Sequence, residues 1–190
     1  MAKQKSKSTL SKADIRTLAE IRLRRRELDQ RKKALSNQAQ REAVTVLKRR
    51  MREASGTAEA KVLAEETHDL RERMELERKQ LRIAERNFDK NATPQVREIL
   101  ERAVVPMREE IAAETVAVQR RYDEHGVEAD PARDPVVSMM QGRINGLLQR
   151  DPLVGLTKGL GARAAWPELP GLEEQIAAAE AELQQQEESK

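Results

Sequence analysis

The chain has 190 residues, of which 38% are hydrophobic, 36% are charged and only three are aromatic. This charged fraction exceeds the ~25% of a typical soluble domain, and so few aromatic rings supply little packing energy to a compact core. The absence of Cys excludes disulfides, thiolate metal sites and a cysteine nucleophile. We therefore expect an all-α, elongated protein of long solvated helices rather than a compact globule.

The net charge of +3 is unevenly distributed. Residues 1–50 hold 16 Lys and Arg against 5 Asp and Glu, whereas residues 167–190 hold seven Glu and one Lys. Opposite charge at the two ends is typical of a tethering role or of self-association. Residues 1–10 are expected to form a basic disordered arm and not a secretory signal, because no apolar segment follows the first charges. The expected location is the cytoplasm or the interior of a virion.

The first Gly is Gly56, so residues 11–55 are predicted to form one long helix. Ser11 is a suitable N-cap residue, and Asp14 stands three positions later in the place of a capping-box partner. Seven of the thirteen residues from 21 to 33 (IRLRRRELDQRKK) are Arg or Lys. These cations point in several directions around a helix, and they interrupt its apolar stripe.

This charge density predicts contact with something negative. One interpretation is a helix that binds the phosphates of a nucleic acid without reading bases. The alternatives are an acidic protein neighbour, the acidic C-terminus of this chain, or plain solvation. The candidate polyanion-binding residues are Arg22, Arg24, Arg25, Arg26, Arg31, Lys32, Lys33, Lys48, Arg49 and Arg50.

Two further helices are predicted over residues 57–90 and 93–125. Each has apolar residues at alternating spacings of four and three, which is the heptad pattern of a coiled coil. Thr93 and Pro94 resemble an N-cap followed by a first-turn proline, Pro106 is expected to kink the second helix, and Gly126 is expected to end it. Because only about three residues separate the helices, we expect an antiparallel hairpin.

The remaining chain is richer in Gly and Pro. Residues 127–171 are predicted to form short amphipathic helices and loops, with helices beginning at Pro135 and Pro152 after Asp residues that can cap them. Residues 172–190 are predicted to form an acidic helix and tail. Because of its Gly and Pro residues, the C-terminal third is expected to be looser than the long helices.

The apolar seams and the face of 135–149 are predicted to pack against other helices. That face offers surface to a partner protein, to the rest of the chain or, as a third option, to a membrane surface. No apolar run approaches the ~20 residues of a membrane span. The candidate packing residues are Leu63, Leu70, Met74, Leu81, Phe88, Leu100, Val104, Met107, Ile111, Val118, Val136, Met140, Ile144 and Leu147.

Residues suited to catalysis are few. His68 has Glu65 and Glu72 within helical reach, but one His and two carboxylates on a solvated helix make a weak metal site. The segment GLTKGLGAR lacks the spacing of a phosphate-binding loop. We therefore expect no enzymatic activity, no metal and no cofactor.

The sequence predicts a non-enzymatic structural or assembly protein that packs against itself or partner subunits, with a basic N-terminal region contacting a polyanion. The composition resembles that of helical bacteriophage scaffolding, neck or internal virion proteins, and of bacterial coiled-coil adaptors. The alternative is a nucleic-acid-binding protein that coats or compacts DNA or RNA. Long helices with weak cores need partners, so an oligomer or a subunit of a larger assembly is expected.

Overall fold

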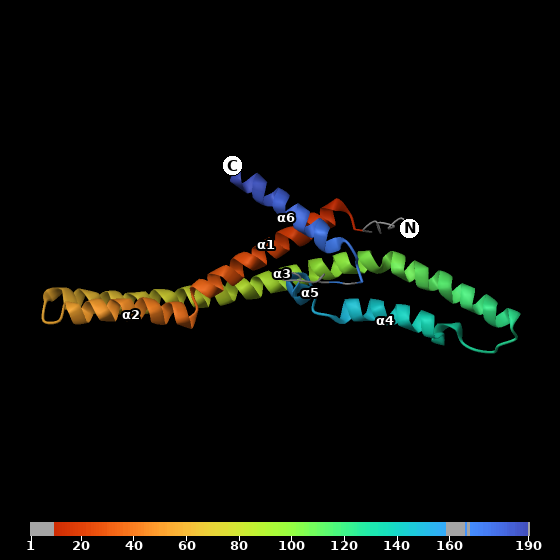
Figure 1. The fold of residues 1–190 in the computed structure, drawn as a ribbon, viewed down its shortest axis with the longest axis horizontal. Helices are drawn as coiled ribbons and strands as arrows, with labels where there is room; N and C mark the ends of the chain where they lie inside the picture. Colours follow the sequence, from red (N-terminus) through yellow and green to blue (C-terminus); the bar gives the residue numbers. More distant parts are fainter. Residues whose placement is uncertain (1–9, 159–165, 167, 190) are drawn as a thin grey trace. The chain divides into compact units, whose positions relative to one another are not determined.

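A computed structural model describes residues 10–158, Trp166 and residues 168–189. The all-α prediction is confirmed, since the described residues form helices and no strand (Figure 1). Most of the predicted basic arm (residues 1–9) lies outside the described residues. The elements are α1 (Lys12–Ala34), α2 (Asn37–Glu53), α3 (Ala58–Glu124), the 3₁₀ helix η1 (Pro131–Arg133), α4 (Pro135–Gln149), α5 (Pro152–Lys158) and α6 (Leu172–Glu188).

The chain divides into two compact units, and the helices α1 and α3 each contribute to both. Unit 1 comprises the described residues of Met1–Leu23 and Asn91–Lys190, and unit 2 comprises Arg24–Lys90. Unit 1 therefore contains the start of α1, the second half of α3 and all of α4, α5 and α6. Unit 2 contains the end of α1, all of α2 and the first half of α3.

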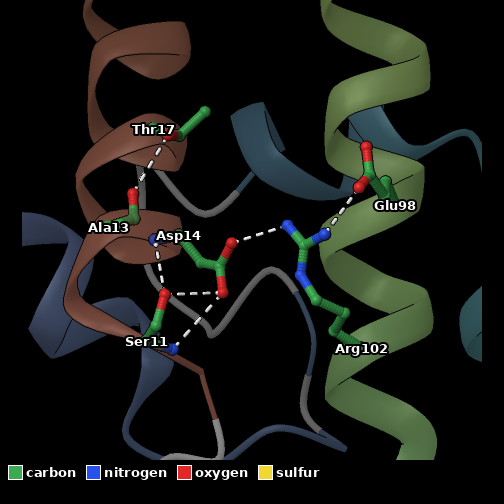
Figure 2. Close-up of polar contacts among 6 residues, drawn as sticks. All are labelled: Ser11, Ala13, Asp14, Thr17, Glu98 and Arg102. Carbon is green, nitrogen blue, oxygen red and sulfur yellow. Dashed lines mark hydrogen bonds and ion pairs between the residues drawn. The ribbon is translucent and has the colours of Figure 1, made fainter.

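The predicted capping box at the start of α1 is confirmed (Figure 2). The Asp14 backbone N–H donates to Ser11 Oγ at 3.1 Å, and the Ser11 backbone N–H donates to Asp14 Oδ2 at 3.4 Å. Within unit 1 the same carboxylate accepts from Arg102 Nη2 of α3 at 2.6 Å, and Arg102 Nη1 donates to Glu98 at 2.7 Å. Asp14 therefore both completes the cap at the start of α1 and joins this helix to α3.

The prediction of one helix over residues 11–55 is wrong, because the helix breaks at residues 35 and 36. Ser36 has an extended backbone and becomes the N-cap of α2, where its side chain accepts from the Ala39 backbone N–H. The carbonyl of Leu35, left without a helical partner, accepts from Arg78 Nε of α3 at 2.8 Å. The break is thus stabilised by a residue distant in sequence.

The predicted break between residues 90 and 93 is absent, because α3 is a single helix of 67 residues that contains both Pro94 and Pro106. The expected hairpin between 57–90 and 93–125 therefore does not form. A proline inside a helix removes one backbone hydrogen bond and costs about 3 kcal/mol. Around Pro94 this cost is offset by the burial of Ala92, Val96 and Ile99 in unit 1, since buried apolar area contributes roughly 25 cal/mol per Å².

Within unit 2, α2 runs back along the first half of α3 (Figure 1). A four-residue turn with Gly56 at φ +83 connects the two helices, and such a short connection makes them antiparallel neighbours. The buried apolar residues described in this unit are Leu28, Val44, Leu63 and Leu81. Coiled-coil packing of these helices stays a prediction.

Unit 1 has a much fuller interior. Of the 23 buried apolar residues that the structure describes, 19 lie in this unit. They come from every α-helix of the unit and include Trp166, the only Trp of the chain. The buried set comprises Ile15, Leu18, Ala19, Ile21, Ala92, Val96, Ile99, Leu100, Ala103, Val104, Val118, Val137, Ile144, Leu147, Leu153, Leu156, Trp166, Leu172 and Ile176.

The helices α4 and α5 begin at the Asp-Pro pairs, as predicted. Asp134 accepts from the Val136 backbone N–H at 2.9 Å to start α4, and Asp151 accepts from the Leu153 N–H at 3.0 Å to start α5. Gly126, at φ +63, follows the end of α3 as predicted. In α5, Gly155 lies against the ring of Trp166, and a Cβ at that position would come within 2.3 Å of the Trp166 Nε1 atom.

Candidate functional site

The basic residues of α1 do not form one surface, and Arg22 is buried. Its side chain is 1% exposed and lies between α1 and α6 within unit 1. Arg22 Nε and Nη2 donate to the two carboxylate oxygens of Glu180 at 2.5 and 2.9 Å, and Nη1 donates to Glu173. Burial alone lowers the pKa of Arg22, but these two carboxylates outweigh it and raise the pKa, so the guanidinium stays charged.

Arg22 is therefore not a polyanion-binding residue, and that part of the prediction is wrong. Its partners belong to the acidic C-terminal segment, which was one of the alternatives that the sequence left open. Removing a charged guanidinium from water costs too much free energy for it to be buried without carboxylate partners. The ion pairs thus fix α6 against the first half of α1, where Figure 1 shows the two helices crossing.

Other basic residues of α1 are paired within unit 2. Arg25 Nη1 donates to Asp89 at 3.0 Å and Lys32 Nζ donates to Glu85 at 2.8 Å, both on α3. Arg24 pairs with Glu27 on its own helix. Arg25 and Lys32 interrupt the apolar stripe of α1, and both reach carboxylates on α3. Arg26 is half-buried.

A second group of basic side chains is exposed. Within the described residues none of them has a carboxylate partner. All belong to unit 2, in the last turn of α1 and along α2. The group comprises Arg31, Lys33, Arg41, Lys48, Arg50 and Arg52. Arg49, also exposed, pairs with Glu53 at 3.1 Å.

Three of these cations share one face of α2. Arg41, Lys48 and Arg52 are separated by seven and four residues, which places them within about 40° of each other at 100° per residue. The buried Val44 lies only about 40° from Lys48 at 100° per residue, so the three exposed cations border the packed side of α2. We call Arg41, Lys48 and Arg52 the α2 basic stripe. Three neighbouring unpaired positive charges on a solvated face favour binding to a polyanion.

Sequence reasoning selected Lys48 but missed Arg41 and Arg52. The signal was available, because both lie at helical spacing from Lys48. The concentration of Arg and Lys at residues 21–33 favoured α1 as the binding helix, but Arg22, Arg25 and Lys32 form ion pairs with α6 or α3. The carboxylate partners of these three cations lie between 53 and 158 positions away in sequence.

The candidate packing residues are mostly used inside the chain. Buried members are Leu63, Leu81, Leu100, Val104, Val118, Ile144 and Leu147, and partly buried members are Leu70, Met74, Phe88, Met107, Ile111 and Met140. Val136 differs from these and is 44% exposed. The face of α4 therefore packs on the rest of unit 1, which was one of the three options for that face.

No metal centre is formed by the described residues, which hold no cluster of three or more His, Asp or Glu side chains suited to a metal ion. His68 Nε2 lies 3.4 Å from Glu72 Oε1, and both side chains are largely exposed.

Tyr122 donates to Asp134 Oδ2 at 3.0 Å, a contact that joins the end of α3 to the cap of α4. The Val136 backbone N–H and the Tyr122 hydroxyl lower the pKa of Asp134.

Among the described helices, none combines the length and apolar character needed to cross a bilayer. No protein-family model, curated protein or solved structure matches the chain.

Proposed function

We propose that the chain is a non-enzymatic structural or assembly protein, whose helices pack against copies of itself or partner subunits and whose α2 contacts a polyanion. The observation that carries the proposal is the α2 basic stripe. In the part of the chain that is described, its three cations are exposed and have no carboxylate partner. Unpaired charge of this kind does nothing for folding and raises self-repulsion.

The chemistry of the stripe suits a repeating anion rather than a single small ligand. The stripe runs from Arg41 to Arg52, a separation of 11 residues, or roughly 16 Å of helix at 1.5 Å per residue. Arg and Lys along a helix attract phosphates without reading sequence, and no aromatic side chain lies on α2 to stack on bases. The expected ligand is therefore a duplex nucleic acid or another linear polyanion.

The test compares R41Q/K48Q/R52Q with R97Q/R120Q/R143Q, which removes the same charge from exposed positions of unit 1. Binding of fluorescent duplex DNA, with heparin as competitor, would be measured by anisotropy from ~50 to ~200 mM salt. Since each phosphate contact contributes about 0.9 to the salt slope, we expect the stripe variant to lose about 2.7 of the slope and the matched control to lose little. Equal weakening by both variants would contradict a defined stripe.

Failure of the wild-type chain to bind at ~50 mM salt would favour an acidic protein partner, because low salt maximises phosphate attraction. Deletion of residues 1–50 does not serve as a test, since it removes Leu18 and Arg22 from the interior of unit 1. The alternative function, coating or compaction of nucleic acid, would add length-dependent, cooperative binding to the same stripe-dependent affinity.

A further inference from the structure

The first half of α3 carries a second line of apolar side chains that no described part of unit 2 covers. Val62, Leu76 and Ile83 are 53, 57 and 58% exposed. Their spacings of 14 and seven residues place them on one face of the helix. The buried Leu81 lies about 140° away from Leu76 at 100° per residue, so the side of α3 occupied by α1 and α2 is a different one.

Charged residues complete this line in a specific order. Positions at alternating spacings of three and four read Val62, Glu65, Asp69, Glu72, Leu76, Lys79, Ile83, Arg86 and Lys90, and all nine are exposed. We call these nine residues the α3 outer seam. Its three acidic members precede Leu76 and its three basic members follow it. The pattern is a heptad repeat with charges in most of the seam positions.

We propose that the α3 outer seam binds a second copy of this chain in antiparallel orientation. This inference rests on the proposed function, of which it names one partner. Antiparallel pairing centred on Leu76 sets Glu65 of each copy against Arg86 of the other, and Glu72 against Lys79. Asp69 then lies opposite Ile83. Parallel pairing in register would oppose like charges, which is destabilising.

The charge order favours a second copy over other occupants. A polyanion would match only the basic half of the seam and would be repelled by the acidic half. When the seam is reversed, Leu76 meets Leu76 and two of the acidic positions meet basic ones, as a two-fold symmetric contact requires. Because few apolar residues contribute, the dimer is expected to be weak, concentration-dependent and weaker at high salt.

The decisive experiment uses two charge-reversal variants, E65K/D69K/E72K and K79E/R86E/K90E, in sedimentation velocity. Each variant alone has a seam of one sign and should be monomeric, whereas an equimolar mixture should form a 1:1 heterodimer. The wild-type chain should dimerise as its concentration rises. A wild-type chain that remains monomeric up to about millimolar concentration, or a mixture that does not associate, would overturn the proposal.

Orientation can be read by cross-linking, because the chain has no native Cys. V62C mixed with K90C should give heterodimers with a short bis-maleimide, and neither variant alone should give cross-linked dimers. Cross-links within V62C alone would mean parallel pairing and would contradict the proposal.

Two charge-neutral variants separate this inference from the proposed function. L76Q/I83Q should abolish dimerisation yet keep DNA binding, and V105Q/V116Q, which changes exposed valines elsewhere on α3, should change neither. Circular dichroism checks that each variant is folded. If the wild-type chain stays monomeric but binds DNA through the α2 basic stripe, only the dimer fails. If it dimerises without binding DNA, only the polyanion contact fails.

Discussion

Units 1 and 2 are built partly from the same two long helices, yet they use charged residues in opposite ways. In unit 1 an Arg is sealed in the interior against two carboxylates, and 19 described apolar side chains surround it or lie elsewhere in that core. In unit 2 four described apolar residues are buried, and every described charged residue is at least partly exposed. Unit 1 therefore has a filled interior, whereas unit 2 has a small one and leaves exposed the two faces for which we propose partners.

The largest expected effect is on the interior charge of unit 1. R22A removes the cation that pairs with Glu173 and Glu180, and removing one partner of a buried ion pair costs about 3–5 kcal/mol. R25A, the matched change in unit 2, breaks partly exposed pairs and should cost about 1 kcal/mol or less. Urea denaturation of both variants measures the difference. Equal destabilisation by R22A and R25A would contradict the difference between the charges of unit 1 and those of unit 2.

A smaller effect is expected where α5 meets Trp166. In G155A the new methyl group would collide with the buried indole, and overpacking of this kind costs about 1–3 kcal/mol. Trp166 fluorescence should shift, since this is the only Trp of the chain. The control is G142A on α4, where a Cβ meets open space and helix propensity should stabilise by roughly 0.5–1 kcal/mol. A neutral G155A would show that the interior is loosely packed.

The capping box of α1 should contribute less. S11A removes the hydroxyl that accepts from the Asp14 backbone N–H and should cost about 1 kcal/mol in the free energy of unfolding. Thermal denaturation at neutral pH measures this change. Restoration of stability by S11T but not by S11V would separate the cap from simple loss of volume.

Asp14 also predicts the acid response of unit 1. Burial raises its pKa, but hydrogen bonds from Ser11 and Arg102 outweigh burial, so the pKa is lowered from its ordinary value. A carboxyl whose pKa is lower in the folded state stabilises above its unfolded pKa, and this stability is lost as the pH falls through the folded value. The urea midpoint should therefore fall from pH 5 to pH 2 more steeply in the wild-type chain than in D14N. Parallel curves would contradict the prediction.

The smallest effect is expected at the surface of unit 2. H68A removes an exposed imidazole and its long contact with Glu72, so stability should change by less than about 0.5 kcal/mol. Added Zn²⁺ should not raise the melting temperature of either the wild-type chain or the variant. A Zn²⁺-dependent rise that H68A abolishes would instead identify a metal site.

Sequence reasoning succeeded where a signal is local. Ser11, Asp134 and Asp151 each cap a helix through backbone N–H groups within three residues, and Gly126 marks the end of α3. The start of α6 at Leu172 was also predicted correctly. Each of these features depends on the conformation of a few neighbouring residues, which is why composition and spacing sufficed.

It failed where distant residues decide the outcome. Pro94 resembles a helix start, but α3 continues through it, because apolar residues on both sides of Pro94 are buried. The end of α1 at Ala34 depends on Arg78, and the burial of Arg22 depends on Glu173 and Glu180. The α3 outer seam was overlooked because Asp69 interrupts its apolar residues. No local pattern distinguishes a cation that is paired across the fold from one that is solvated.

The Arg22 ion pairs also set an order of events during synthesis. Arg22 leaves the ribosome 158 residues before Glu180, so the interior of unit 1 cannot close until α6 has been made. Unit 2 is continuous in sequence, from Arg24 to Lys90, and its helices can pair while the rest of the chain is still being translated. The basic helix α2 can therefore fold before the interior of unit 1 is complete.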